Sequence, residues 1–322
     1  MELRSGLAKW IADMLDFRDS MGFLRRKREN VMRRFDSYCC ESHPGASVLT
    51  EEIVRGWLAS EASRVAVASM RMRANEMRAL ANYIRAFGGE AYVLPYKLYP
   101  ATSEFTPHVM TDAELASLFR QIDREAASES CDQAVRGAYS VLFRLIYTCG
   151  LRPQEGRTAK TADLDLSRRE LFLRKTKCNA ERIVGLSVEM TELLAKYTRR
   201  LASASPGGEF LFPRRDGRAP TANAVGMFFH VCWRKADVNA TRGDVPRARV
   251  YDLRHRFAST VLQRWMDEGR EMYVMLPFLR AYMGHSEMSS TLYYVHLLPE
   301  NMRRSAKVDW AKLNAIVPEV GS

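Results

Sequence analysis

Apolar and polar positions alternate at helical spacing through the first ninety residues. Apolar residues recur every three or four positions over 7–17 and again over 23–38, which is typical of amphipathic helices. Thr50, followed by two glutamates, predicts the capped start of a third helix. A fourth helix is expected over 61–87, where a pair of glycines would stop it. The pattern therefore predicts a helical domain over residues 1–90.

A different pattern begins after this domain. The segment 91–108 carries three prolines and no clear period, so we expect an interdomain linker. Thr111 opens a capping box, which predicts the first helix of a second domain over 109–322. Within that domain, 170–174 and 182–186 alternate in strand fashion around a polar turn. We expect a mainly α-helical protein of two domains, the second with a small antiparallel β-sheet.

Composition indicates the kind of partner. The chain has 322 residues, and its 49 Lys and Arg against 38 Asp and Glu give a net charge of +11. The excess is clustered, as at Arg25 and Arg26, which favours a polyanion as partner, although a solvated basic face would look the same. In the predicted fourth helix, arginines repeat every seven residues and share one face that would either follow a phosphate backbone or face solvent. These are Arg64, Arg71, Arg78 and Arg85.

Several classes of protein are disfavoured by the sequence. The six cysteines show neither the paired spacing of a zinc site nor a small-domain disulfide framework, so reduced thiols are expected. The sequence has no long apolar run and no signal-peptide core, which predicts a cytoplasmic protein. It also has no acidic cluster suited to two-metal hydrolysis and no glycine-rich phosphate loop, so neither a metal nor a nucleotide cofactor is expected.

A first chemical motif is Gly150-Leu151-Arg152, which follows an apolar helix predicted over 134–147. Gly150 can end that helix in the left-handed conformation, and Pro153 can open the next helix. This places Arg152 at a corner between helices, where it can point into a cleft. Taken alone, such a corner is more often structural.

The C-terminal part of the chain adds a second cluster. Tyr251-Asp252-Leu253-Arg254-His255 precedes Gly284-His285, and Tyr294 follows nine residues after that histidine. Arginines can clamp a phosphate, and a tyrosine hydroxyl can accept the phosphoryl group. The arrangement therefore suits phosphoryl transfer to a tyrosine.

The order of these motifs resembles the tyrosine recombinase (phage integrase) family over residues 108–300. That family shows Gly-Leu-Arg-x-x-Glu, a hairpin lysine, His-x-Leu-Arg-His, Leu-Gly-His and a tyrosine nine residues on. The resemblance implies a site-specific recombinase, integrase or transposase that cuts and rejoins double-stranded DNA through a 3′-phosphotyrosine. It further implies a bacterial mobile element as the setting, a helical domain that clamps DNA, and a homotetramer on two DNA sites.

The same resemblance assigns roles to the basic residues. Arg152 and Arg254 would grip the scissile phosphate, because their fixed forks suit two nonbridging oxygens. Lys177 matches the hairpin lysine that protonates the departing 5′ oxygen. Lys175 lies two residues away on the same strand face and stays a rival, and a solvated hairpin tip is the plain alternative for both.

The resemblance also implies roles for the remaining site residues. His285 would hydrogen-bond the phosphate region, with a buried structural histidine as the alternative. Tyr294 would be the nucleophile rather than Tyr293, because only Tyr294 lies three residues after Thr291, as in the family pattern. Helix 299–313 would dock on a neighbouring protomer or pack on its own domain.

Tyr251 is the position where the chain departs from the family, which usually has histidine there. A tyrosine hydroxyl can still donate a hydrogen bond to the phosphate but accepts a proton poorly at neutral pH. Two alternatives stay open at this point. One is a telomere resolvase or relaxing (type IB) topoisomerase with the same chemistry, and the other is a DNA-binding accessory subunit with little activity of its own.

Overall fold

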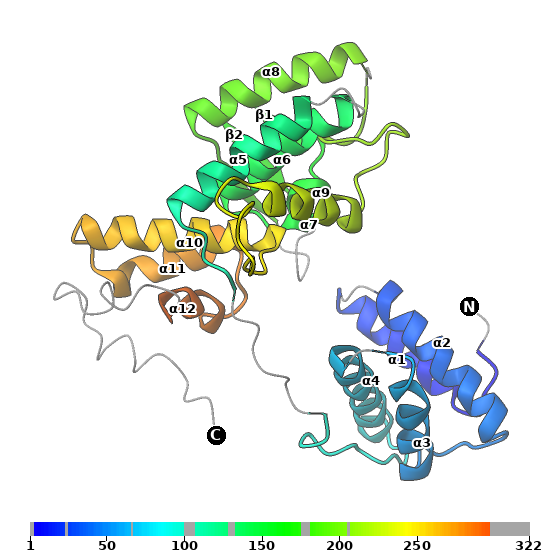
Figure 1. Ribbon diagram of the computed structural model, residues 1–322. Coiled ribbons are helices and arrows are strands. Elements are labelled where there is room, and N and C mark those ends of the chain that lie inside the picture. Colours follow the sequence, from blue (N-terminus) through cyan, green and yellow to red (C-terminus); the bar gives the residue numbers. More distant parts are fainter. Residues whose placement is uncertain are drawn as a thin grey trace. The chain divides into compact units, whose positions relative to one another are not determined.

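The computed structural model describes most of the chain, namely residues 3–22, 25–65, 67–99, 107–127, 133–174, 181–204 and 207–296. The chain divides into two compact units, Met1–Thr106 and Pro107–Ser322, which are described separately (Figure 1). In the described residues, no helix combines the length and the apolar character that a membrane crossing requires.

The first unit is built from helices around an apolar core. In chain order they are α1 (Ala8–Ser20), α2 (Arg25–Ser42), α3 (Glu51–Ala62) and α4 (Val67–Ala86). The expected cap of α3 is confirmed, since the Thr50 side chain accepts a hydrogen bond from the backbone N–H of Ile53 at 3.3 Å. In the core, the rings of Phe35 and Trp57 meet edge to face with centroids 5.2 Å apart.

The fourth predicted helix is wrong in one respect, because 61–87 is not continuous. Helix α3 ends at Ala62 and α4 begins at Val67. Arg64 lies in the turn between them, exposed and 3.9 Å from the buried Glu61. The seven-residue repeat of arginines therefore does not run along a single helix.

Arg78 also departs from the predicted exposed stripe. Its side chain lies inside the first unit, where the residue is only 3% exposed. The guanidinium donates hydrogen bonds to the carbonyls of Leu94 at 3.0 Å, Pro95 at 2.7 Å and Leu98 at 2.5 Å. Its role is to hold the chain that follows α4, so its assignment to a DNA-facing stripe is wrong. Arg71 and Arg85 are exposed on α4, as expected.

The segment predicted as a linker begins inside the first unit. Leu94 is buried in the core, and residues 91–93 and 98–99 pack against it. Leu49 and Ala91 form an isolated parallel bridge. The prolines interrupt the helical pattern here, but the apolar side chains between them still supply core contacts, which is why this stretch does not behave as a free linker.

The second unit is mainly helical and carries a small sheet. Its helices are α5 (Asp112–Ala127), α6 (Gln133–Cys149), α7 (Pro153–Arg157), α8 (Val188–Ala204), α9 (Ala222–Lys235), α10 (Val250–Asp267), α11 (Met272–Met283) and α12 (Ser289–His296), with the 3₁₀ turn η1 (Thr161–Asp163). The strands β1 (Leu164–Asp165), β2 (Glu170–Leu173) and β3 (Arg182–Gly185) pair antiparallel in that order. The predicted fold class and hairpin are confirmed.

Two apolar clusters position the site in this unit. The larger one surrounds α6, whose side chains pack against α5, α8 and α10. The smaller one joins α10, α11 and α12, which lie side by side in Figure 1, through residues such as Leu262, Leu276 and Leu292. The capping box predicted at Thr111 is confirmed, because its backbone N–H donates to Glu114 at 2.9 Å and its hydroxyl accepts from the N–H of Glu114 at 3.2 Å.

Candidate active site

Arg152 stands at the corner that the sequence predicts. Helix α6 ends at Cys149, and Gly150 follows in the left-handed conformation with φ +59°. A side chain at Gly150 would place its Cβ 2.6 Å from Phe257 Cε1 and closer still to the adjoining ring carbon, so only glycine fits this turn. Pro153 then opens α7, with Arg152 in the capping position.

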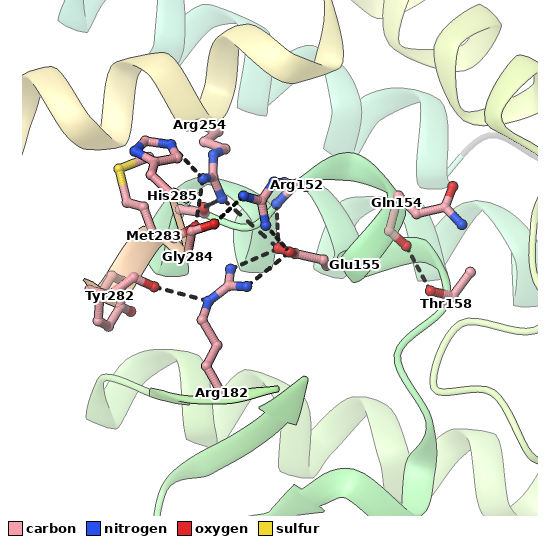
Figure 2. A network of polar contacts seen from close by, with 11 residues as sticks. Arg152, Gln154, Glu155, Thr158, Arg182, Arg254, Tyr282, Met283, Gly284 and His285 are labelled. Carbon is pink, nitrogen blue, oxygen red and sulfur yellow. Dashed lines mark hydrogen bonds and ion pairs between the residues drawn. The ribbon is translucent and has the colours of Figure 1, made fainter. Parts of the chain in front are cut away.

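Glu155 is the centre of the polar network in Figure 2. Its Oε1 accepts from Nη1 of Arg152 at 2.6 Å and from Nη1 of Arg182 at 2.9 Å. Its Oε2 accepts from the backbone N–H of Arg152 at 2.8 Å and from Nη2 of Arg182 at 2.8 Å. Burial alone would raise the pKa of Glu155, but the hydrogen bonds and charges of the two arginines outweigh it and hold the pKa below its ordinary value. The carboxylate is therefore ionised.

The C-terminal end of α11 is occupied by three arginines. The carbonyl of Tyr282 accepts from Nε of Arg182 at 2.9 Å. The carbonyl of Met283 accepts from Nη2 of Arg254 at 2.7 Å, and that of Gly284 accepts from Nη2 of Arg152. The last carbonyls of a helix have no partner within the helix and carry its negative dipole end, so guanidinium groups stabilise them. The turn that leads into His285 is held in place by these bonds.

Arg254 is not among the described residues that line the pocket, but it contacts His285, which does line it. It is 0% exposed, and its Nη1 donates to the carbonyl of Gly150 at 2.7 Å. Its Nη2 lies 3.0 Å from Nε2 of His285, whose Nδ1 lies 2.8 Å from Oγ1 of the buried Thr291. Because a guanidinium only donates, Nε2 accepts and Nδ1 carries the hydrogen that Thr291 accepts. His285 is thus a neutral imidazole with a defined tautomer.

Tyr294 lies on α12 next to these groups. Its ring stacks on His285 with centroids 5.9 Å apart and an interplanar angle of 16°. The residue is 2% exposed, and burial raises the pKa of Tyr294 to about 12, although the charge and hydrogen bond of Arg254 oppose this rise. The phenol is protonated in this state. Its neighbour Tyr293 is less buried.

Tyr251 and His255 lie one turn apart at the start of α10. Their ring centroids are 5.0 Å apart, and His255 also lies 5.4 Å from the ring of Tyr294. Burial, together with the charges of Arg249 and Arg254, lowers the pKa of His255 to about 4. His255 is therefore neutral at physiological pH.

The pocket that these elements enclose has a volume of about 410 Å³. It is lined by Arg152, Tyr251, His255, His285, Ser286, Ser289, Ser290, Tyr293 and Tyr294. Of the residues predicted for the site, four line the pocket and Arg254 supports it from below, while Lys177 lies outside the described residues. Among the described residues, His, Cys, Asp and Glu side chains form no group of three suited to a metal.

Three residues of the site were not assigned a role from the sequence. Glu155 is part of the Gly-Leu-Arg motif, but its position between two arginines depends on the fold. The sequence identifies Arg182 only as the first residue of a predicted strand. Its charge at that position is the one signal that points to a polar contact. Thr291 serves there only to set the spacing to Tyr294, whereas its hydroxyl fixes the tautomer of His285.

The fold and this site define a tyrosine recombinase, an enzyme that cuts and rejoins DNA through a covalent tyrosine intermediate. The chain belongs to the phage integrase family, whose model matches residues 108–301. The Sinorhizobium fredii protein y4rE, named as an integrase/recombinase, is 27% identical over 296 residues, which make up 90% of this chain and 91% of that protein. The tyrosine recombinase XerD of Rhizobium meliloti is 28% identical over 207 residues, or 63% of this chain and 61% of that protein.

Solved structures share the fold. The Tn1549 transposon integrase in complex with transposon right end DNA matches 95% of this chain and 99% of its own, with a TM-score of 0.62 and 15% identity. The lambda integrase tetramer bound to a Holliday junction matches 89% of this chain and 76% of its own, with a TM-score of 0.60 and 15% identity. At such identities the likeness concerns the fold alone.

Proposed function

We propose that Tyr294 attacks a DNA phosphate at a site formed by Arg152, Arg254 and His285. The observation that carries this proposal is their convergence: Tyr294, His285 and Arg152 line one pocket, and Arg254 hydrogen-bonds His285 directly below it. Guanidinium groups that are charged at every working pH stabilise the negative charge that develops on a pentavalent phosphorus.

In the proposed step, the phenol oxygen of Tyr294 forms a bond to phosphorus while its O–H bond breaks and the released proton passes to solvent water. The bond from phosphorus to the 5′ oxygen breaks in turn, and that oxygen takes up a proton, for which Lys177 is the proposed donor. The resulting phosphotyrosine retains the phosphodiester energy, so attack by a 5′ hydroxyl reverses the reaction and rejoins DNA. Tyr251, which lines the pocket, is the proposed additional hydrogen-bond donor to the phosphate.

The assembly is proposed as a homotetramer on two DNA sites. In support, the fold matches a lambda integrase that was crystallised as a tetramer on a Holliday junction and a XerH recombinase bound to a palindromic difH substrate. The predicted docking helix 299–313 lies outside the described residues. The relatives named here are integrases and recombinases, so they do not favour a telomere resolvase, a topoisomerase or an accessory subunit.

The DNA contacts of the first unit are likewise proposed. Arg64, Arg71 and Arg85 have exposed side chains suited to phosphate contacts, while Arg78 is buried. The side chains of Arg25 and Arg26 lie outside the described residues. Such contacts would supply affinity without reading sequence.

A nicked suicide duplex tests the proposed function. Loss of the short fragment beyond the cleavage point prevents rejoining, so the covalent protein–DNA adduct accumulates and survives denaturation. Wild-type protein and Tyr293→Phe should form the adduct, whereas Tyr294→Phe should bind DNA but form none. An adduct in Tyr294→Phe would exclude Tyr294 as the nucleophile, and products from paired sites would distinguish recombination from relaxation.

A further inference from the structure

Arg182 is a third arginine beside the two that are assigned to the phosphate. Its side chain is 11% exposed, and it is not among the described residues that line the pocket. Both Nη atoms donate to Glu155, at 2.9 and 2.8 Å, and its Nε donates to the carbonyl of Tyr282 at 2.9 Å. Because all three of its nitrogens donate to Glu155 or Tyr282, the described contacts of Arg182 are with the protein.

Glu155 would oppose phosphate binding if it stood without Arg182. Its carboxylate already takes one hydrogen bond from the Arg152 guanidinium at 2.6 Å and lies 3.9 Å from Nη1 of Arg254. A carboxylate this close competes with a phosphate for the same two guanidinium groups. Arg182 supplies Glu155 with two charge-assisted bonds, which leaves less of its charge to be neutralised by Arg152 and Arg254.

The charge balance of the cluster supports this role. Three guanidinium groups and one carboxylate leave a net charge of two positive units (+3 − 1 = +2). A phosphodiester carries one negative charge and its pentavalent transition state carries two, so the intact cluster matches the transition state. Without Arg182 the cluster would retain a single positive unit.

Arg182 also packs under the turn that carries His285. Gly284 ends α11 with φ +65°, and a Cβ added there would lie 2.9 Å from Nη1 of Arg182. The carbonyl of the same glycine accepts from Arg152. Strand β3, helix α7 and the turn before His285 therefore meet on the Arg182 side chain, as Figure 2 shows.

We propose that Arg182 is a positioning residue, which neutralises Glu155 and thereby limits the competition of this carboxylate with the phosphate for Arg152 and Arg254. This inference rests on the proposed function, because it takes these two arginines as the phosphate ligands. Arg182 itself is not among the described residues that line the pocket beside Tyr294.

A double substitution tests the proposal. The rate of adduct formation on the nicked duplex, at saturating DNA, is measured for Arg182→Gln, Glu155→Gln and the double variant. Arg182→Gln should slow the step about 100-fold, since an uncompensated carboxylate now binds the catalytic guanidinium groups. Removing that carboxylate as well restores a net charge of +2, so the double variant should be at least about tenfold faster than Arg182→Gln. A double variant as slow as or slower than Arg182→Gln would overturn the proposal.

Control variants separate this role from general effects on charge or folding. Arg174→Gln removes the same charge from the end of β2, where Arg174 pairs with Asp163 at 2.6 Å, and should keep the rate within about twofold. A loss as large as that of Arg182→Gln would mean that any charge of the sheet matters. If Arg182→Gln does not fold, Arg182→Lys replaces it, because lysine keeps the charge. The double variant Arg182→Lys with Glu155→Gln should then form the adduct no more slowly than Arg182→Lys alone. A slower double variant would contradict the proposal.

Adduct formation by the wild-type protein distinguishes failure of the proposed function from failure of the role of Arg182. If it forms no Tyr294-dependent adduct, the proposed function fails. If it does form the adduct and Glu155→Gln brings no rescue, only the role of Arg182 fails.

Discussion

Arg254 donates a hydrogen bond to Nε2 of His285 across 3.0 Å, and this contact determines which nitrogen of the imidazole carries hydrogen. His285 then donates from Nδ1 to Thr291, so both ring nitrogens are engaged before DNA arrives. The same Arg254 also holds the carbonyls of Gly150 and Met283. Its fork therefore joins the ends of α6 and α11 beneath the pocket.

Arg254→Lys should retain the charge but lose cleavage. A single ammonium cannot serve Gly150, Met283 and His285 in the geometry of the planar fork, so we expect a rate of adduct formation at least about 100-fold lower. Arg264→Lys is the matched control on the same helix, since Arg264 is exposed and pairs only with Glu268 among the contacts described. Equal rates for Arg254→Lys and wild type would show that charge alone suffices.

Tyr251→Phe tests the residue at which this chain differs from the usual pattern of its family. Loss of one hydrogen bond to the transition state, worth roughly 1.5 to 3 kcal/mol, should lower the cleavage rate by about ten- to a hundredfold. Tyr251→His should keep or raise the rate, and its pH profile should gain a dependence near roughly pH 6 to 7, where imidazole titrates. An unchanged rate in Tyr251→Phe would mean that the ring only packs against His255.

Folding stability should depend on pH through His255. Its pKa is about 4 in the folded protein and 6.5 ordinarily, so between these values the unfolded chain binds the proton and the folded protein does not. Stability is therefore complete above about pH 6.5 and falls as the pH drops toward 4, by about 3 kcal/mol in total from this group. Unfolding by urea at several pH values should show a shallower loss in His255→Gln over that window. An identical slope in both proteins would contradict the depressed pKa.

Exposed arginines of α4 should affect DNA binding at every sequence. Replacing Arg71 and Arg85 together by Gln should weaken binding and flatten the dependence of the binding constant on salt by about one unit of slope per lost phosphate contact. Fluorescence anisotropy across a salt series measures that slope. An unchanged slope would mean that both side chains face solvent and do not contact phosphates.

Arg78→Gln should behave differently, although the residue belongs to the same sequence repeat. It leaves the carbonyls of Leu94, Pro95 and Leu98 without their donor, so the first unit should lose about 3 kcal/mol of unfolding free energy. Thermal or urea unfolding measures this loss, with Arg85→Gln as the exposed control. A stable Arg78→Gln protein with weakened DNA binding would indicate that Arg78 contacts DNA.

Much of the fold is predictable because its signals are local. The cap at Thr50, the capping box at Thr111 and the left-handed stop at Gly150 each act within a few residues, and the structure confirms all of them. The break between α3 and α4 was missed, since the residues around Arg64 keep a helical pattern although the chain turns there.

The sequence by itself determined which chemical groups are present and in what order, because motif spacing and helical periodicity are properties of neighbouring residues. Only the tertiary structure decided what those groups do to one another. Arg71 and Arg78 belong to one repeat, yet one faces solvent and the other binds carbonyls 16 to 20 residues away. Arg182 reaches Glu155 across 27 residues of chain, and Arg152 reaches Gly284 across 132. Burial, charge neutralisation and tautomer depend on distance in space, which spacing along the chain does not contain.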